Sequence, residues 1–275
     1  LELAGGKAVN VARALVTLGA PARVVVPLGG HNGAAVADAL AAEGIPATLV
    51  PTSANTRRCV SAVDEQSGAT TEFYEPAAAL DADALDRVCG LVDGLLDGWL
   101  AVSGSMDATV IPAVTDAFAR AAGRGVRLAV DLQGAALRAV LDRVPVALVK
   151  VNRSEAAELF GPGQPRDLAV RLHEAGAATA VVTDGAFGAV GLTAGGAWLA
   201  TPGERGRYAV GSGDSFLAGL LAGLSAGEAL PDALAFATDA AAANTRAPGA
   251  ARFAASDLAG IAAGAVVRRL EGAIS

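Results

Sequence analysis

From residue 81 onward, apolar segments typical of buried strands alternate with segments that have the apolar spacing of helices. The expected strands are short and rich in valine and alanine, and they span 99–103, 127–131, 147–151 and 179–183. Helices are expected between and around them over 81–92, 111–122, 137–141 and 167–175. Such an alternation builds a parallel sheet that helices cover on both faces. We therefore predict an α/β fold with a mostly parallel central sheet.

The segment at about 47–74 breaks this order. A strand expected over 47–50 is followed by two more, over 58–64 and 69–74, joined through Gln66-Ser67-Gly68. Alternating strands around a glycine-containing turn are typical of an antiparallel hairpin. We predict that this segment forms a small antiparallel lid. With 275 residues and 53% apolar content, the chain is otherwise expected to build one domain over 1–275.

The chain begins at Leu1, and Gly5-Gly6-Lys7 leads directly into a helix expected over 9–18. A strand over 23–28 and a helix over 32–43 follow. A glycine-rich turn that opens a helix normally follows a strand. We therefore expect an N-terminal strand to be missing.

Composition excludes several classes of function. The formal charge of −7 argues against a nucleic-acid or anionic-membrane partner. The chain has no apolar run long enough to span a membrane. It has two cysteines without paired spacing and two histidines, which leaves little basis for a disulfide framework or a zinc site. We expect a cytoplasmic protein.

The stretch 208–219 carries the sharpest chemical signal. Gly211 and Gly213 flank Ser212, and Asp214 follows, just before leucines at helical spacing. A glycine-rich turn that opens a helix presents free amides to an anion. A carboxylate beside such amides could accept the proton of a hydroxyl during phosphoryl transfer. The alternative is that Ser212 or Asp214 only caps a core helix, and this stretch alone favours that alternative.

Other polar residues follow strands of the expected sheet, where α/β folds bind their ligands. Asn152 and Glu155 have the spacing of a capping box, and they could also hold a hydrated magnesium ion. Asp184-Gly185 is typical of a hairpin turn, and Asp131 of a helix cap. For each of these segments taken alone, the structural role is more common than the functional one.

The order of these segments indicates more than any one of them. It resembles the phosphofructokinase-B branch of the ribokinase-like carbohydrate kinases over essentially the whole chain, and most of all 1-phosphofructokinase and tagatose-6-phosphate kinase. The motifs that carry the resemblance are Gly5-Gly6-Lys7-x-x-Asn10-Val-Ala-Arg13, Thr56-Arg57, Ser103-Gly104-Ser105, Lys150-x-Asn152-x-x-Glu155 and Val210-Gly-Ser-Gly-Asp214. The resemblance implies a three-layer αβα sandwich with a small lid, and a homodimer formed through the lid.

The resemblance also implies roles on the nucleotide side. Asp214 matches the catalytic base of such kinases, and Gly211, Ser212 and Gly213 match the anion hole for the transferred phosphoryl group. The residues that match contacts to ATP and its Mg²⁺ are Lys150, Asn152, Glu155, Thr183, Gly185, Gly188 and Asn244. Among them, Asn152 and Glu155 match the magnesium motif, and Asn244 matches a position beside the adenine.

On the sugar side, the matching residues are Gly6, Lys7, Asn10, Arg57 and Ser105, with Arg57 as a substrate-phosphate contact on the lid. Lys7 and Arg57 could alternatively be solvated surface charges. Several departures from the family pattern cluster here, at Ala8, Cys59, 106–108 and 208–209.

The implied function is ATP-dependent phosphorylation of a sugar hydroxyl on a ketohexose phosphate such as fructose-1-phosphate, fructose-6-phosphate or tagatose-6-phosphate. Two alternatives remain open. One is a ribokinase-type kinase of an unphosphorylated sugar or a nucleoside. The other is a non-catalytic sugar-binding or regulatory homologue.

Overall fold

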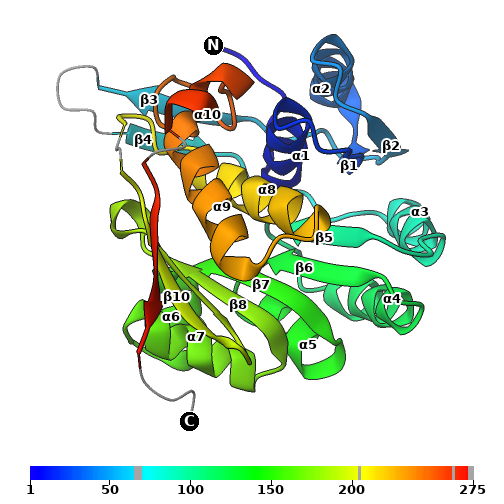
Figure 1. The fold of residues 1–275 in the computed structure, drawn as a ribbon. Coiled ribbons are helices and arrows are strands. Elements are labelled where there is room, and N and C mark those ends of the chain that lie inside the picture. The colour runs from blue at the N-terminus through cyan, green and yellow to red at the C-terminus, as the bar shows by residue number, and fades with distance from the viewer. Residues whose placement is uncertain (65–69, 204–205, 262–263, 272–275) are drawn as a thin grey trace.

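A seven-stranded sheet forms the centre of the computed structural model, which describes residues 1–64, 70–203, 206–261 and 264–271 (Figure 1). Its strands are β5 (Trp99–Ser103), β6 (Arg127–Asp131), β7 (Val146–Asn152), β8 (Ala177–Thr183), β9 (Ala189–Thr193), β10 (Gly196–Thr201) and β11 (Val266–Leu270). They lie side by side in sequence order. Strands β5 to β8 are parallel, and β8 to β11 pair antiparallel. The predicted parallel strands are therefore present, and an antiparallel extension follows them.

Helices cover both faces of this sheet, as the sequence predicts (Figure 1). One face packs against α1 (Lys7–Thr17), α8 (Ser212–Ser225) and α9 (Leu230–Asn244). The other face packs against α4 (Ile111–Gly123), α5 (Gly134–Arg143), α6 (Arg153–Phe160) and α7 (Pro165–Glu174), with α3 (Ala82–Asp93) beside them. The remaining helices are α2 (Gly30–Ala42), α10 (Ala255–Ile261) and the short 3₁₀ turn η1 (Gly185–Phe187). The three-layer αβα architecture is confirmed.

Side chains alternate between the two layers with the two-residue period of a strand. In β6, Val130 packs into the layer of α4 to α7, and Ala129 packs into the layer of α8 and α9. In β7, Val149 packs into the layer of α4 to α7, and Leu148 packs into the layer of α8 and α9. The same parity places the polar ends of these strands, Asp131 and Lys150, in the layer of α8.

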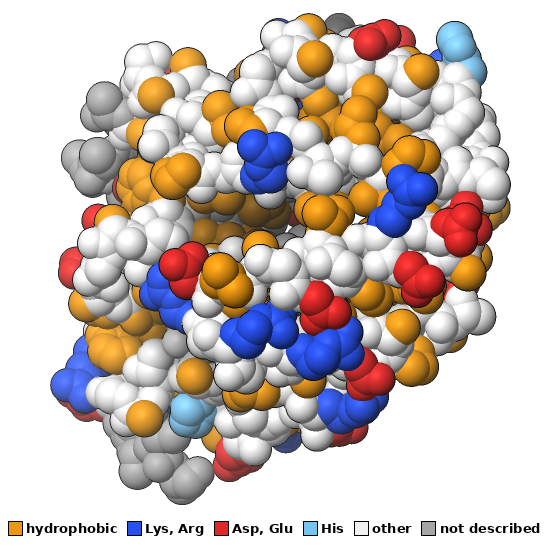
Figure 2. Space-filling model, turned by 90° about the vertical axis from the view of Figure 1, so that its right-hand side faces the viewer, with side chains coloured by type: hydrophobic (Ala, Val, Ile, Leu, Met, Phe, Trp, Pro, Cys, Tyr) orange, Lys and Arg blue, Asp and Glu red, His pale blue; other side chains and the backbone are white. Residues whose placement is uncertain are grey.

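The N-terminal part forms a separate unit of sheet. Strand β1 (Val24–Leu28) pairs in parallel with β2 (Ala47–Pro51), and α1 and α2 pack on them. The start of the predicted lid range, residues 47–51, is therefore paired with β1 and does not belong to the hairpin. Among the described residues, β1 and β5 belong to different sheets, and both line one cleft. Figure 2 shows this side of the molecule, where apolar side chains line a hollow.

The predicted hairpin is present as β3 (Cys59–Val63) and β4 (Thr70–Tyr74), which pair antiparallel. The predicted turn at Gln66-Ser67-Gly68 lies outside the described residues. Val60 faces Phe73 across the pair, and their residue surfaces are 59% and 61% exposed. The hairpin thus presents apolar side chains that the rest of the described chain leaves uncovered.

Strand β11 and the 3₁₀ turn η1 complete the connections of the large sheet. Strand β11 pairs with β10 at the edge of the sheet, and η1 joins β8 to β9. Among the helices that the structure describes, none combines the length and the apolar character needed to cross a membrane.

Candidate active site

The carboxyl ends of the parallel strands and the start of α8 open onto one large cleft. Every predicted site residue except Asn244 lines this cleft, including residues from α1, the lid, β7 and α8. Residues that are far apart in sequence are therefore gathered in one place. This cleft is therefore the candidate active site.

The turn before α8 depends on a glycine conformation. Gly211 is the N-cap and has a φ of 83°, in the left-handed region. A Cβ at this position would lie 2.6 Å from the Cα of Ala250, so a side chain would also collide with the neighbouring loop. The Ser212 amide donates to the Ala209 carbonyl at 3.1 Å. Gly213 and Asp214 follow in the first turn, where no helical carbonyl reaches the amides and no described side chain caps them. These amides are suited to an anion.

Asp214 is buried in this first turn and faces α1. Its Oδ2 accepts a hydrogen bond of 2.8 Å from Asn10 Nδ2. Burial raises the pKa of Asp214 to about 6, and the charge of Asp131 adds to this effect. The Asn10 hydrogen bond and the ammonium groups of Lys150 and Lys7 act in the opposite direction. Asp214 is therefore a carboxylate near neutral pH that can still take up a proton, as a general base requires.

Asp131 connects two lysines beneath this turn. Its carboxyl group is fully buried, accepts from Lys150 Nζ at 3.2 Å and from Ser103 Oγ at 3.2 Å, and lies 3.5 Å from Lys7 Nζ. A Cβ on Gly213 would lie 3.1 Å from Lys150 Nζ, which places this buried ammonium against the first turn of α8. The sequence suggested a helix cap at Asp131, but Gln133 is the N-cap of α5. Two features of the sequence could have identified Asp131 as a site residue. It lies at the end of a strand, and the two-residue alternation of that strand places its side chain in the layer of α8.

Lys7 is not a free surface charge. Its side chain is 39% exposed, and its Nζ lies 3.4 Å from Glu155 Oε1 as well as near Asp131. Burial opposes protonation, but the carboxylates of Asp131, Glu155 and Asp214 outweigh it and raise the pKa of Lys7. The ammonium therefore stays charged at the floor of the cleft.

Asn152 and Glu155 form the capping box that the sequence suggested. Asn152 Oδ1 accepts from the Glu155 amide at 2.9 Å, and Glu155 Oε2 accepts from the Asn152 amide at 2.8 Å. Glu155 Oε1 points towards Lys7 and the cleft. Among the described residues, no group of three acidic, histidine or cysteine side chains could hold a metal ion. An ion bound here would need ligands from a nucleotide or from water.

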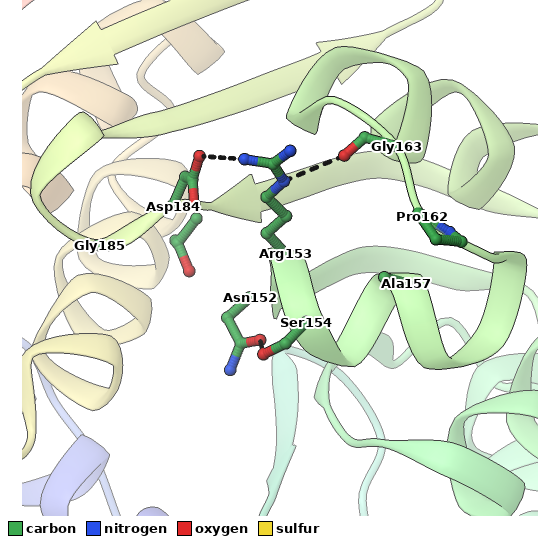
Figure 3. A pocket seen from close by; sticks show the side chains of 9 residues that line it. Asn152, Arg153, Ser154, Ala157, Pro162, Gly163, Asp184 and Gly185 are labelled. Atoms are coloured by element: carbon green, nitrogen blue, oxygen red, sulfur yellow. Dashed lines mark hydrogen bonds and ion pairs between the residues drawn. The ribbon is translucent and has the colours of Figure 1, made fainter.

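A smaller pocket of about 420 Å³ lies beside the start of α6 (Figure 3). Arg153 forms its wall, with an ion pair of 3.2 Å to Asp184 and a hydrogen bond of 3.0 Å to the Gly163 carbonyl. Thr183 and Gly185, two predicted nucleotide contacts, line both this pocket and the large cleft. The turn after β8 therefore separates the two spaces.

The same turn requires Gly188. The Asp184 amide donates to the Gly188 carbonyl at 2.8 Å and closes the connection between β8 and β9. Gly188 has a φ of 101°, and a Cβ there would lie 2.0 Å from the Ala200 carbonyl oxygen. The hairpin-turn interpretation of this segment is confirmed, and the turn still exposes Gly185 to the cleft.

Asn244 differs from the other predicted residues. Its side chain is fully buried at the end of α9 and does not line the cleft. Its Nδ2 lies within hydrogen-bonding distance of the Val210 carbonyl and Ser212 Oγ, at 2.9 and 3.0 Å, and its Oδ1 accepts from the Ala251 amide at 2.7 Å. Asn244 thus stabilises the turn before α8 through its side-chain hydrogen bonds.

The remaining sugar-side residues lie at the rim. Gly6 is the N-cap of α1, and Ser105 is exposed just beyond β5. Arg57 is exposed at the base of the lid and has no hydrogen bond or ion pair with any described residue. Its guanidinium is available to an anionic ligand.

The chain is similar to known carbohydrate kinases along most of its length. The profile of the pfkB family carbohydrate kinases matches residues 2–257. ATP-dependent 6-phosphofructokinase isozyme 2 of Escherichia coli K12 is 31% identical over 253 residues, which covers 88% of this chain and 81% of that enzyme. The 1-phosphofructokinase of Rhodobacter capsulatus is 33% identical over 245 residues, which covers 86% of this chain and 77% of that enzyme.

A solved structure shows the same fold. Phosphofructokinase-2 from Escherichia coli in complex with potassium superposes with a TM-score of 0.88 at 30% identity. The superposition covers 94% of this chain and 87% of that one.

Proposed function

The chain belongs to the pfkB family of carbohydrate kinases, and we propose that it transfers the γ-phosphoryl group of ATP to a hydroxyl group of a ketohexose phosphate. The observation that carries this proposal is Asp214, a buried carboxylate in the first turn of α8 with a pKa raised to about 6 by its burial. It adjoins amides that have no partner within the helix. A base next to an anion site is the arrangement that phosphoryl transfer to an alcohol needs.

In the proposed reaction, Asp214 takes the proton from the acceptor hydroxyl. The hydroxyl oxygen forms a bond to the γ-phosphorus while the bond from that phosphorus to the bridging oxygen of ADP breaks. Gly211, Ser212 and Gly213 form the turn that holds the transferred group, and Lys150 beneath Gly213 offsets its negative charge. Lys7 adds a second positive charge from α1.

The same proposal assigns Mg²⁺ to Glu155 and Asn152. The donor set suits this ion, because Mg²⁺ keeps several waters and binds one or two carboxylates together with substrate phosphates. Glu155 contributes the carboxylate that faces the cleft, and Asn152 holds it in place through the capping box. When bound, the ion would offset charge on the phosphate oxygens. Thr183, Gly185 and Gly188 are proposed as the nucleotide turn.

The proposed acceptor carries a phosphate of its own. Support comes from the curated relatives, which are named as kinases of fructose phosphates. It also comes from Arg57, an exposed guanidinium with no described partner at the base of the lid. A guanidinium can grip a phosphate through two parallel hydrogen bonds. Gly6, Asn10 and Ser105 are proposed to contact the sugar.

We also propose that two copies associate through the lid hairpin, with residues 1–275 acting as one kinase domain. The exposed apolar pair Val60 and Phe73 would be covered in such a dimer. A kinase that depends on ATP would act in the cytoplasm, where ATP is held.

The test is a coupled assay of the purified protein with Mg-ATP against fructose-1-phosphate, fructose-6-phosphate, tagatose-6-phosphate, free hexoses, ribose and nucleosides. We expect ADP release with a sugar phosphate and much less with the matching free sugar. Preference for a free sugar or a nucleoside would favour a ribokinase-type enzyme. Nucleotide binding without transfer to any acceptor would indicate a non-catalytic homologue.

A further inference from the structure

Arg13 is a buried cation on α1, one turn after Asn10. Its side chain is buried, and the residue is 6% exposed. Its guanidinium forms an ion pair with Glu43 through two nitrogens. It also donates to the Ala4 carbonyl at 2.6 Å and to Asn10 Oδ1 at 3.0 Å. A charged group with this many partners is held in one position.

This position determines which way the Asn10 amide points. A guanidinium has only donors, so it can satisfy the oxygen end of an amide and never the nitrogen end. Because Arg13 holds Oδ1, the Nδ2 of Asn10 is left to face Asp214, to which it donates at 2.8 Å. With the amide reversed, Asn10 would set its oxygen against a carboxylate oxygen, and two acceptors would oppose each other.

We propose that Arg13 is a positioning residue for phosphoryl transfer, which fixes the Asn10 amide in the one orientation that donates to Asp214, and that Glu43 fixes Arg13 in turn. This proposal rests on the proposed function of Asp214 as the base. Arg13 acts through Asn10, and it is not itself expected to touch the substrate.

A second contact connects Arg13 to the anion turn. Its Nη1 donates to the Ala250 carbonyl at 3.3 Å. The Ala250 Cα lies 2.6 Å from where a Cβ of Gly211 would sit, so this loop packs directly on the turn before α8. One guanidinium therefore adjoins both the partner of the base and the loop behind the anion site.

Other charges face Asp214 directly, and the experiment has to separate them from Arg13. They are Lys150 from β7, Asp131 from β6 and Lys7 from α1. Loss of Arg13 leaves all three in place, and it removes the support of Asn10 together with the contacts of Arg13 to Ala4, Glu43 and Ala250. The cleanest test is therefore the coupling between Arg13 and Asn10.

We expect Arg13→Met to lower kcat by about 10- to 100-fold, the effect of a misplaced catalytic contact, while KM for ATP stays near its original value. Arg13→Lys should restore part of kcat, because an ammonium can still donate to Asn10 Oδ1. In an Asn10→Ala background, Arg13→Met should have little further effect on kcat. If Arg13 and Asn10 acted independently, the fold-losses in kcat from the two substitutions would instead multiply in the double variant.

Arg120→Met is the matched control, because it removes an exposed arginine that is paired with Asp93 and does not line the cleft. It should leave kcat unchanged. An equal loss from Arg13→Met in both Asn10 backgrounds would overturn the proposal, as would no loss from Arg13→Met in the otherwise natural chain. If Arg13→Met does not fold, Glu43→Gln and the double variant Arg13→Met/Glu43→Gln take its place. Each of them should show the same dependence on Asn10.

A measurement on the free protein separates this inference from the proposed function. Carbon-13 NMR of the Asp214 carboxyl group, assigned with Asp214→Asn, follows its titration without any substrate. Both Asn10→Ala and Arg13→Met should raise the midpoint, because each removes a donor that favours the carboxylate. An unmoved midpoint in Arg13→Met overturns the inference even if the kinase activity is confirmed. A raised midpoint supports it even if no acceptor is phosphorylated.

Discussion

Asn10 donates a hydrogen bond of 2.8 Å to Asp214 and so joins helix α1 to the first turn of helix α8 across 204 positions of sequence. The two residues come from distant parts of the chain, and each lies in the first turn of a helix that follows a glycine-rich turn. Their contact brings the proposed sugar side and the proposed phosphoryl side of the cleft together. A hydroxyl group bound beside this contact would lie next to the base.

The first prediction concerns the base itself. Asp214→Asn keeps the shape of the side chain but removes the group that accepts the proton. We expect kcat to fall by about 10²- to 10⁴-fold, while nucleotide affinity changes little because the amides of the turn remain. Steady-state kinetics and calorimetric ATP binding measure the two effects. Asp232→Asn, in the first turn of α9, is the matched control and should not alter kcat. Near-normal turnover in Asp214→Asn would mean that Asp214 has only a structural role, as the acceptor of the Asn10 hydrogen bond.

The second prediction is a pH dependence. The pKa of Asp214 is raised to about 6 by burial, and the residue acts as a base only when it is deprotonated. The kcat/KM of the enzyme should therefore rise with pH, reach half of its maximum near pH 6 and level off about one pH unit above that. In Asn10→Ala the carboxylate loses a donor, so its pKa should increase and the rising limb should move to higher pH. A limb centred near the ordinary pKa of an aspartate, or one that Asn10→Ala does not move, would contradict this assignment.

The third prediction separates the two roles of Glu155. Glutamine can replace glutamate in a capping box, so Glu155→Gln should keep the start of α6 intact. It removes the negative charge proposed to attract Mg²⁺. The magnesium concentration for half-maximal activity should increase by about 10-fold or more. Circular dichroism checks the fold, and Glu158→Gln, exposed on the same helix, is the control. Unchanged magnesium dependence would leave Glu155 as a helix-capping residue alone.

The fourth prediction concerns the acceptor phosphate. Arg57→Ala removes a charged hydrogen-bond donor worth about 1.5–3 kcal/mol to a bound phosphate. The KM for a sugar phosphate should therefore increase by more than about 10-fold, while KM for ATP stays the same. Arg87→Ala, an exposed arginine of α3 that does not line the cleft, serves as the control. Equal kinetics of Arg57→Ala and the natural chain towards sugar phosphates would favour an acceptor without a phosphate.

Much of the fold follows from local patterns. The predicted strand over 99–103 has the bounds of β5, and that over 127–131 has the bounds of β6. Their apolar side chains and short length are sufficient to identify buried strands. Strand β11 was not predicted, because its two arginines interrupt an apolar pattern. It is an edge strand with exposed positions, and its pairing with β10 holds it in the sheet.

The candidate site was also predictable only in part from local sequence patterns. Asn152 and Glu155 could be read as a capping box because both partners lie within one turn of helix. The partners of Asp131 could not be identified from its neighbours in sequence. Its two lysines come from α1 and from β7, and only the packed sheet brings them to its carboxyl group. Asn244 shows the converse, since its position in a family motif suggested a ligand contact, while the tertiary structure uses its amide to hold the glycine turn.

The sequence by itself determined most of the strands and helices and the glycine turn before Asp214, because strand and helix periods and glycine conformations act within a few residues of chain. The tertiary structure decided what Asp214 touches, how Arg13 orients Asn10 and which lysines share Asp131. These contacts join elements up to 204 positions apart, and their geometry depends on how α1 and α8 pack on the same face of the sheet. Local periodicity determines which face of a helix or strand is apolar. Which residues the polar end of that element contacts is determined only by the packing of the helix layers on the sheet.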